Sequence, residues 1–245
     1  MNALLILKAQ LLNLLRRLRQ KPICRTIASP LCRRLEDKKT AELAFQLNWA
    51  KEFSRNRDLV ERYWRKYRYL NELEQLCEFT PHTRVLDVGC GISTVLHYVK
   101  GERVGVDPLG DIYNRIYRYP PGIIVIGAPG ERLPLPDASF DVAFCSNVLD
   151  HVDQPAGVIS EIRRVLRPAA VLLLTVEVFP QVMLRDPAHP HCFTTQDVHE
   201  FLATGWDRLL EGESPWIGLR NFVSGDRDPQ SRREMVLILR KNTPA

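Results

Sequence analysis

Two acidic residues and a glycine turn near residue 90 are the first groups in the chain that could do chemistry. Val85–Gly91 has the pattern of a buried strand that runs into a Gly-x-Gly turn and then a helix. Glycine permits the tight turn, and the following helix N-terminus offers free N–H groups to a ligand. Asp87 precedes the first glycine. Asp107 ends the next strand, where a carboxylate can accept hydrogen bonds from ribose hydroxyls.

The glycine turn and Asp107 allow two other interpretations, a helix cap and a nicotinamide site. Asp107 could cap the helix expected over 109–117, with or without a ligand. A nicotinamide site also uses a glycine turn and a later acid, but its third glycine would fall at Thr94. That interpretation also leaves Asp87 unexplained, so a nicotinamide cofactor is disfavoured.

A second set of polar side chains could supply a general base. Asp150 and His151 follow one predicted strand, and His189 and His191 lie in the loop after another. Histidine is the usual group for removing a proton near neutral pH. His151 could equally be a structural histidine bonded to backbone at the start of a helix.

The same loop raises the question of a metal ion. His189 and His191 stand close in sequence to Asp186 and Cys192. Their spacing matches none of the common closed zinc patterns, so no metal site is expected.

Short apolar runs alternate with helical segments after Pro81, which predicts an α/β domain with a parallel sheet covered on both faces. Strands are expected at 84–88, 103–106, 123–126, 140–145, 171–179 and 235–240. Helices are expected at 93–99, 109–117, 156–166 and 196–203, and Thr194 or Thr195 should cap the last of them.

The chain divides into three parts by pattern. Residues 1–40 form a basic amphipathic arm, 41–80 a helical cap or lid, and 81–245 the α/β domain. The cap should contain two helices broken near 54–56, the second running from Leu59 to Cys77.

The composition, with 45% hydrophobic and 26% charged residues, excludes long disorder and an integral membrane protein. The six cysteines are scattered and form no C-x-x-C pair. That fits a reducing compartment, and we expect a cytoplasmic protein without a disulfide framework.

Charge is concentrated in the arm. Residues 1–40 carry ten lysines or arginines against Glu36 and Asp37, whereas the whole chain has a net charge of only +5. The remaining chain is mildly acidic, so no nucleic-acid partner is expected.

Residues 1–19 have the pattern of an amphipathic helix. Six leucines fall within an arc of about 100° on a helical projection: Leu4, Leu7, Leu11, Leu14, Leu15 and Leu18. The helix could lie on an anionic membrane surface, or dock on the body or on a second subunit. Its apolar stretches are too short to span a bilayer.

Four motifs in order give the chain a family resemblance. They are Val85–Gly91 followed by Asp107, the run LPLPDASFD at 133–141, the run SNVLDHV at 146–152, and the run EIRRVLRP at 161–168. Together they resemble the small-molecule branch of the class I S-adenosylmethionine-dependent methyltransferases, over about residues 84–205. The resemblance implies a Rossmann-like, doubly wound, mostly parallel seven-stranded sheet with an N-terminal helical cap.

The resemblance also implies the roles of individual residues. Asp87, Gly89 and Gly91 would hold the methionine part of S-adenosyl-L-methionine, and Asp107 the ribose. The remaining family positions that would contact the cofactor are Pro108 or Leu109, Gly130, Glu131, Ser146 and Asn147.

Some positions depart from the family or carry two interpretations. The family often binds the adenine amino group with an aspartate where this chain has Pro129, so adenine recognition would depend on backbone groups or Glu131. His151 matches a position that is often histidine. Tyr63, Trp64 and Tyr67 are expected in the core, although helices at this place in the family often close over the cofactor as a lid.

The implied activity is methyl transfer to a small-molecule acceptor. Such transfer needs mainly alignment of acceptor, methyl group and sulfur. The candidate catalytic residues are His151, His189 and His191. The alternative is a non-catalytic S-adenosylmethionine-binding or regulatory protein of the same fold.

Overall fold

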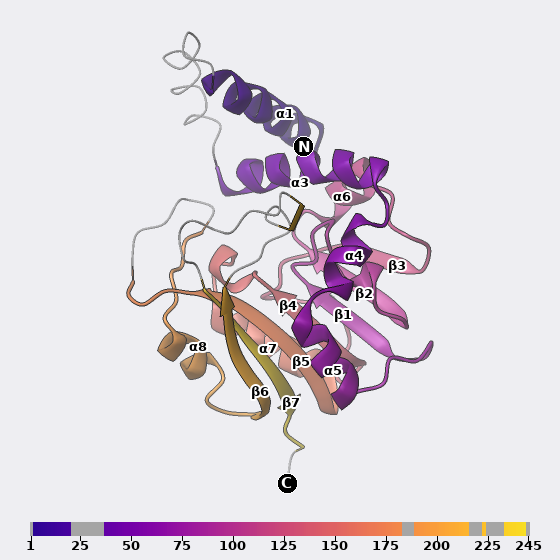
Figure 1. Cartoon of the computed structure of the whole chain (residues 1–245), viewed down its shortest axis with the longest axis vertical. Helices are drawn as coiled ribbons and strands as arrows, with labels where there is room; N and C mark the ends of the chain where they lie inside the picture. The colour runs from indigo at the N-terminus through magenta and orange to yellow at the C-terminus, as the bar shows by residue number, and fades with distance from the viewer. Residues whose placement is uncertain (1, 21–36, 183–188, 216–221, 224–232, 244–245) are drawn as a thin grey trace.

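The computed structural model describes residues 2–20, 37–182, 189–215, 222–223 and 233–243 (Figure 1). Its centre is a seven-stranded sheet of order β3-β2-β1-β4-β5-β7-β6. The strands are β1 Arg84–Val88, β2 Glu102–Asp107, β3 Ile123–Gly127, β4 Phe140–Ser146, β5 Leu166–Val178, β6 Trp206–Pro215 and β7 Arg233–Lys241.

The first five strands run parallel, whereas β7 is antiparallel to both β5 and β6. The expected Rossmann-like, mostly parallel seven-stranded sheet is therefore confirmed. Strand β6 was missed in the sequence because its only apolar run is the pair Leu209 and Leu210, set among charged residues such as Arg208 and Glu211, as suits a strand at the edge of the sheet.

Helices cover both faces of the sheet (Figure 1). The sheet separates the apolar interior into two cores. One face packs against helices from the N-terminal part of the chain and α6 Gly110–Ile116. The other packs against α7 Pro155–Val165 and α8 Thr195–Phe201. Side chains alternate along a strand, so neighbouring residues of β5 supply different cores: Leu173 one and Leu172 the other.

The N-terminal helices are α1 Asn2–Arg19, α3 Lys38–Arg55, α4 Leu59–Arg65 and α5 Arg68–Leu76. The prediction of one helix over Leu59–Cys77 was wrong, because Tyr67 has an extended backbone between α4 and α5. This break lets the Tyr67 hydroxyl donate a 2.9 Å hydrogen bond to Glu234 of β7.

A second helix prediction was also wrong. Only a 3-10 turn, Val95–His97, forms within 93–99. The Thr94 backbone is extended, and its hydroxyl bonds both the N–H of Leu96 and the carboxylate of Asp87. A continuous helix through Thr94 would lose this connection to the sheet.

Candidate functional site

The carboxyl ends of β1, β2 and β4 bring the predicted polar residues to one edge of the sheet. Asp87 is the fourth residue of β1 and pairs in register with Gly105 of β2 and Phe144 of β4. The N–H of Gly89 donates a 2.7 Å bond to the carbonyl of Val106, which fixes the turn against β2. Ligands of open α/β sheets bind at this edge.

The glycine turn needs its glycines. Gly89 and Gly91 have φ angles of +71° and +51°, which side chains rarely adopt. A Cβ on Gly89 would lie 2.4 Å from a methyl carbon of Val148, and one on Gly91 would lie 2.9 Å from the amide nitrogen of Gln46. The turn is therefore held between the loop after β4 and the helix α3.

Asp87 is buried and hydrogen-bonded by the segment that follows the turn. The Thr94 hydroxyl donates a 2.6 Å hydrogen bond to its carboxylate. Burial raises the pKa of Asp87 to about 7, and the bond from Thr94 opposes that rise. A cation that approached Asp87 would stabilise its charged form.

Asp107 organises the start of the next loop. Its carboxylate accepts hydrogen bonds from the N–H of Leu109 at 2.8 Å and of Gly91 at 3.1 Å. Burial raises the pKa of Asp107 to about 6. The side chain thus links the glycine turn to the beginning of α6, as well as ending β2.

The end of β4 leaves two buried oxygens without hydrogen-bond partners among the described residues. They are Oγ of Ser146 and Oδ1 of Asn147, and Asn147 has a positive φ of 55°. A buried oxygen without a partner is costly in a folded protein. Both atoms are therefore candidates for contact with a bound polar ligand.

The loop after β3 carries Gly130 and Glu131. Gly130 is buried, and a Cβ there would lie 3.1 Å from Val88. The Glu131 carboxylate accepts bonds from the N–H groups of Asp153 and Gln154, immediately before α7. Glu131 therefore has a structural role that the sequence did not indicate. Pro108, after β2, is exposed.

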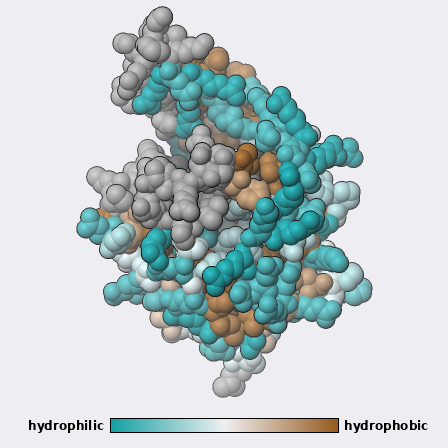
Figure 2. All heavy atoms as spheres, viewed as in Figure 1, coloured by the Kyte–Doolittle hydropathy of each residue, from teal (hydrophilic) through white to brown (hydrophobic). Residues whose placement is uncertain are grey.

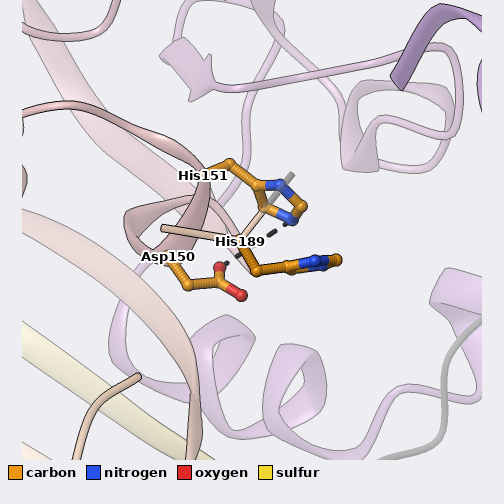
Figure 3. Close-up of side chains that lie close together, drawn as sticks. All are labelled: Asp150, His151 and His189. Carbon is orange, nitrogen blue, oxygen red and sulfur yellow. Dashed lines mark ion pairs between the residues drawn. The ribbon is translucent and has the colours of Figure 1, made fainter. Parts of the chain in front are cut away.

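Two of the predicted histidines meet beside Asp150 (Figure 3). The rings of His151 and His189 have centroids 4.3 Å apart, and Nε2 of His151 lies 3.9 Å from Oδ1 of Asp150. Potential ligand atoms of the three side chains all lie within 4.8 Å of one another. Such a group could move a proton or hold a divalent metal ion.

His191 lies in a different setting. A ring nitrogen is 3.0 Å from the carbonyl of Val152, and the ring stacks on Phe193. The ring of His191 therefore has different neighbours from the ring of His189, although the His191 backbone N–H bonds the carbonyl of Asp150 at 3.4 Å. Asp186 lies outside the described residues.

Comparison with known proteins identifies the family. A methyltransferase domain model matches residues 86–174, from β1 to the middle of β5. An S-adenosylmethionine-dependent methyltransferase from Mesorhizobium loti superposes with a TM-score of 0.54, at 16% identity, over 73% of this chain and 100% of that one. The chain belongs to the class I S-adenosylmethionine-dependent methyltransferases.

Two curated proteins resemble this class I methyltransferase in sequence. Human thiol S-methyltransferase TMT1B is 32% identical over 173 residues, which cover 64% of this chain and 66% of that protein. The ubiquinone biosynthesis O-methyltransferase of Hahella chejuensis is 32% identical over 138 residues, which cover 48% of this chain and 57% of that protein. The chain spans less than half the length of the first curated relatives it matches.

S-adenosylmethionine is the cofactor of this methyltransferase family, and the residues fit it. The Asp87 carboxylate is suited to the ammonium and Asp107 to the ribose hydroxyls. The oxygens of Ser146 and Asn147 without partners lie at the end of the adjoining strand β4. When bound, the cofactor supplies an activated methyl group on a sulfonium.

The LPLPDASFD segment of the methyltransferase has a structural role. The Asp141 carboxylate accepts a 2.8 Å bond from the N–H of Arg84, at the start of β1, and pairs with Arg167. Arg164 of α7 donates bonds to the carbonyls of Leu133 and Leu135. The segment thus fixes β4 and α7 relative to the strand that carries the glycine turn.

Sequence reasoning missed three residues around the methyltransferase turn. The Gln46 amide oxygen accepts a 3.2 Å bond from the N–H of Ile92, and the Tyr119 hydroxyl donates a 2.8 Å bond to the carbonyl of Gly91. Thr94 bonds Asp87. Only Thr94 carried a signal, because it stands in the place of a third glycine; Gln46 and Tyr119 are too distant in sequence.

The aromatic residues of the cap have both structural and polar contacts. Trp64 is buried, and its indole N–H donates a 2.7 Å bond to the carbonyl of Ser93 beside the turn. Tyr67 bonds Glu234, whose pKa is raised to about 7 by burial. The cap thus contacts both the glycine turn and β7. Glu234 of β7 lies opposite Glu177 in the antiparallel register, near the carboxyl end of β5.

Proposed function

We propose that the protein transfers the methyl group of S-adenosylmethionine to the thiol or hydroxyl of a small molecule. The observation that carries the proposal is the group of Asp150, His151 and His189 just beyond Ser146 and Asn147. Methyl transfer to a thiol or hydroxyl requires removal of a proton, for which histidine is suited. The similarity to a thiol S-methyltransferase and an O-methyltransferase supports the same acceptor classes.

In this proposal, the first two strands hold the cofactor. Asp87 and the turn at Gly89 and Gly91 bind its methionine part, Asp107 binds the ribose, and Ser146 and Asn147 contact the region near the sulfonium. Pro108, Gly130 and Glu131 border the adenine, with Glu131 acting through its backbone because its carboxylate bonds residues before α7. The protein's main contribution is alignment, since the leaving group is already activated.

The proposed general base is His151, with His189 beside it. The base would lie beside a carboxylate, with Nε2 of His151 3.9 Å from Oδ1 of Asp150. His189 narrows the space into which an acceptor can enter, because its ring lies against that of His151 (Figure 3). His191 orients the loop through Val152 rather than acting on the acceptor.

The test combines binding with transfer. Titration calorimetry with S-adenosylhomocysteine measures cofactor binding, and transfer of a labelled methyl group is then measured on a panel of small thiols, phenols and amines. We expect binding, and transfer to thiols or phenols but not to amines. Transfer only to amines would overturn the acceptor class, and absence of S-adenosylhomocysteine binding would overturn the proposed function.

The alternative is a non-catalytic S-adenosylmethionine-binding or regulatory protein. Its support is Pro129, which cannot accept a hydrogen bond from the adenine amino group with its side chain. Cofactor binding without transfer to any member of the panel, or to the small molecules of a cell extract, would favour this alternative.

A further inference from the structure

Helix α1 has two apolar sides, and only one of them packs on other residues that the structure describes. Ala9, Leu12 and Leu15 are buried, and α1 lies along α3 (Figure 1). The Asn13 amide donates a 2.8 Å bond to the carbonyl of Ala44 and accepts one from Asn48. These contacts fix which side of α1 faces outward.

The outward side carries a stripe of leucines. Leu4, Leu7, Leu11 and Leu14 are exposed by 62%, 65%, 45% and 53%. Their spacing of three, four and three residues aligns them on one side of the helix. Figure 2 shows apolar side chains along the outer edge of α1 beside a hydrophilic band. A contiguous row of exposed leucines is a feature of interaction surfaces.

The charges that flank this leucine stripe are all positive. Helix α1 contains Lys8, Arg16, Arg17 and Arg19 and no acidic residue. The first acid in the chain is Glu36, and four more lysines or arginines lie between residues 20 and 35. The surface that the stripe offers is therefore apolar in the middle and cationic around it.

These positive charges distinguish between two partners that could cover the leucine stripe, a second copy of the chain and an anionic bilayer. In a self-association through the leucine stripe, Lys8 and Arg17 would flank the contact on both copies, with no carboxylate of α1 to pair with them. An anionic bilayer complements the same charges and accepts the leucines at the boundary between headgroups and acyl chains. Among the described residues, no helix has the length and hydropathy to cross a membrane.

We propose that α1 lies on an anionic membrane surface, with the leucine stripe of Leu4, Leu7, Leu11 and Leu14 inserted and its basic residues among the headgroups. The buried side of the same helix stays on α3, so the membrane and the methyltransferase domain are separated by one helical layer. This proposal is independent of the acceptor, because it depends only on α1.

The experiment is co-sedimentation of the full chain with phosphatidylglycerol vesicles and with phosphatidylcholine vesicles, at low and high salt. We expect binding to phosphatidylglycerol that weakens with salt, and little binding to phosphatidylcholine. Leu7→Ser combined with Leu11→Ser should reduce the partition coefficient at least about tenfold, since both side chains leave the apolar phase. Lys8→Glu combined with Arg17→Glu should reduce it by a similar factor.

The matched control is Leu76→Ser, which removes a leucine of 41% exposure from α5. It should sediment like the unchanged chain, and circular dichroism should show that all variants stay folded. Absence of binding to phosphatidylglycerol, or equal binding by the double serine variant, would overturn the proposal. So would a concentration-dependent dimer that the double serine variant abolishes, because it would assign the stripe to a second copy.

Discussion

The hydroxyl of Thr94 donates a 2.6 Å hydrogen bond to the carboxylate of Asp87, and both side chains are buried. Burial raises the pKa of Asp87 to about 7, while the bond from Thr94 acts in the opposite direction. The carboxylate proposed to face the cofactor's ammonium therefore changes charge near neutral pH.

Cofactor binding should depend on this charge. We expect affinity for S-adenosylhomocysteine to rise with pH and level off above about 7, being roughly tenfold weaker one pH unit below the pKa. Thr94→Val removes the bond that favours the charged form, so its binding profile should move to higher pH. Thr94→Ser is the control that keeps the hydroxyl. Identical profiles for the valine variant and the unchanged chain, measured by calorimetry, would contradict this role of Thr94.

The same pKa predicts how stability changes with pH in the absence of cofactor. Because the folded-state pKa of Asp87 lies above its ordinary value, its protonation favours the folded chain. That contribution is complete below about pH 4 and is lost as the pH rises through about 7. Asp87→Asn cannot titrate at this position and should not lose this contribution. The free energy of unfolding of the variant minus that of the unchanged chain should therefore increase from about pH 4 to about pH 7. Urea denaturation at several pH values measures the difference, and a constant difference would count against the shift.

Asp107 should contribute to cofactor affinity through its negative charge. Asp107→Asn keeps an oxygen that can accept the bond from Leu109 but removes the charge. We expect S-adenosylhomocysteine binding to weaken by about 1.5–3 kcal/mol, or tenfold or more. Asp111→Asn, an exposed acid in the first turn of α6, is the control and should bind normally. A loss below about tenfold for Asp107→Asn would argue against contact with the ribose.

The histidines should differ in their effect on methyl transfer. His151→Ala should lower kcat by about a hundredfold or more, as expected for loss of a general base. His191→Ala is the comparison, because its ring faces the carbonyl of Val152, and it should retain most activity. An equal effect of the two substitutions on the rate of labelled methyl transfer would be inconsistent with the assignment.

A chelator distinguishes proton transfer from metal binding in the group of Asp150, His151 and His189. We expect transfer to persist after treatment with EDTA, because the proposed role is that of a base. Activity that is lost with the chelator and restored by Zn²⁺ would instead assign these three side chains as metal ligands.

Two aspartates of the LPLPDASFD segment should contribute unequally to stability. Asp141→Ala removes the acceptor of the Arg84 N–H and should lower the free energy of unfolding by about 1–3 kcal/mol. Asp137 is 76% exposed and pairs with Arg164, so Asp137→Ala should cost less than about 1 kcal/mol. Denaturant unfolding of both variants measures the contrast, and equal losses would refute the structural role of Asp141.

The sequence alone predicted the parallel sheet and the edge at which the site lies. The run Val171–Leu174, and Val85–Val88 with its single polar residue Asp87, have the pattern of buried strands, and the turn at Gly89 follows the second directly. These features are local, because a strand, the turn after it and the acid that ends it are neighbours in the chain. The family motifs have the same local character.

Local pattern was misleading where a distant contact decides the conformation. The segment around Tyr67 has helical periodicity, yet its backbone is extended where its hydroxyl bonds Glu234, 167 residues away. The 93–99 segment is likewise held by the bond from Thr94 to Asp87. In each case a buried polar group gains a partner that a continuous helix would deny it.

Tertiary structure also decided which of several similar residues come together. His189 and His191 are equivalent by sequence, but their rings meet different neighbours: His189 lies against His151, whereas His191 stacks on Phe193 and lies beside the carbonyl of Val152. The leucines of α1 form one arc in sequence, yet Leu15 is buried on α3 while Leu7 and Leu11 face outward. Periodicity fixes the angle of a side chain around its helix, whereas burial depends on where the neighbouring helix lies.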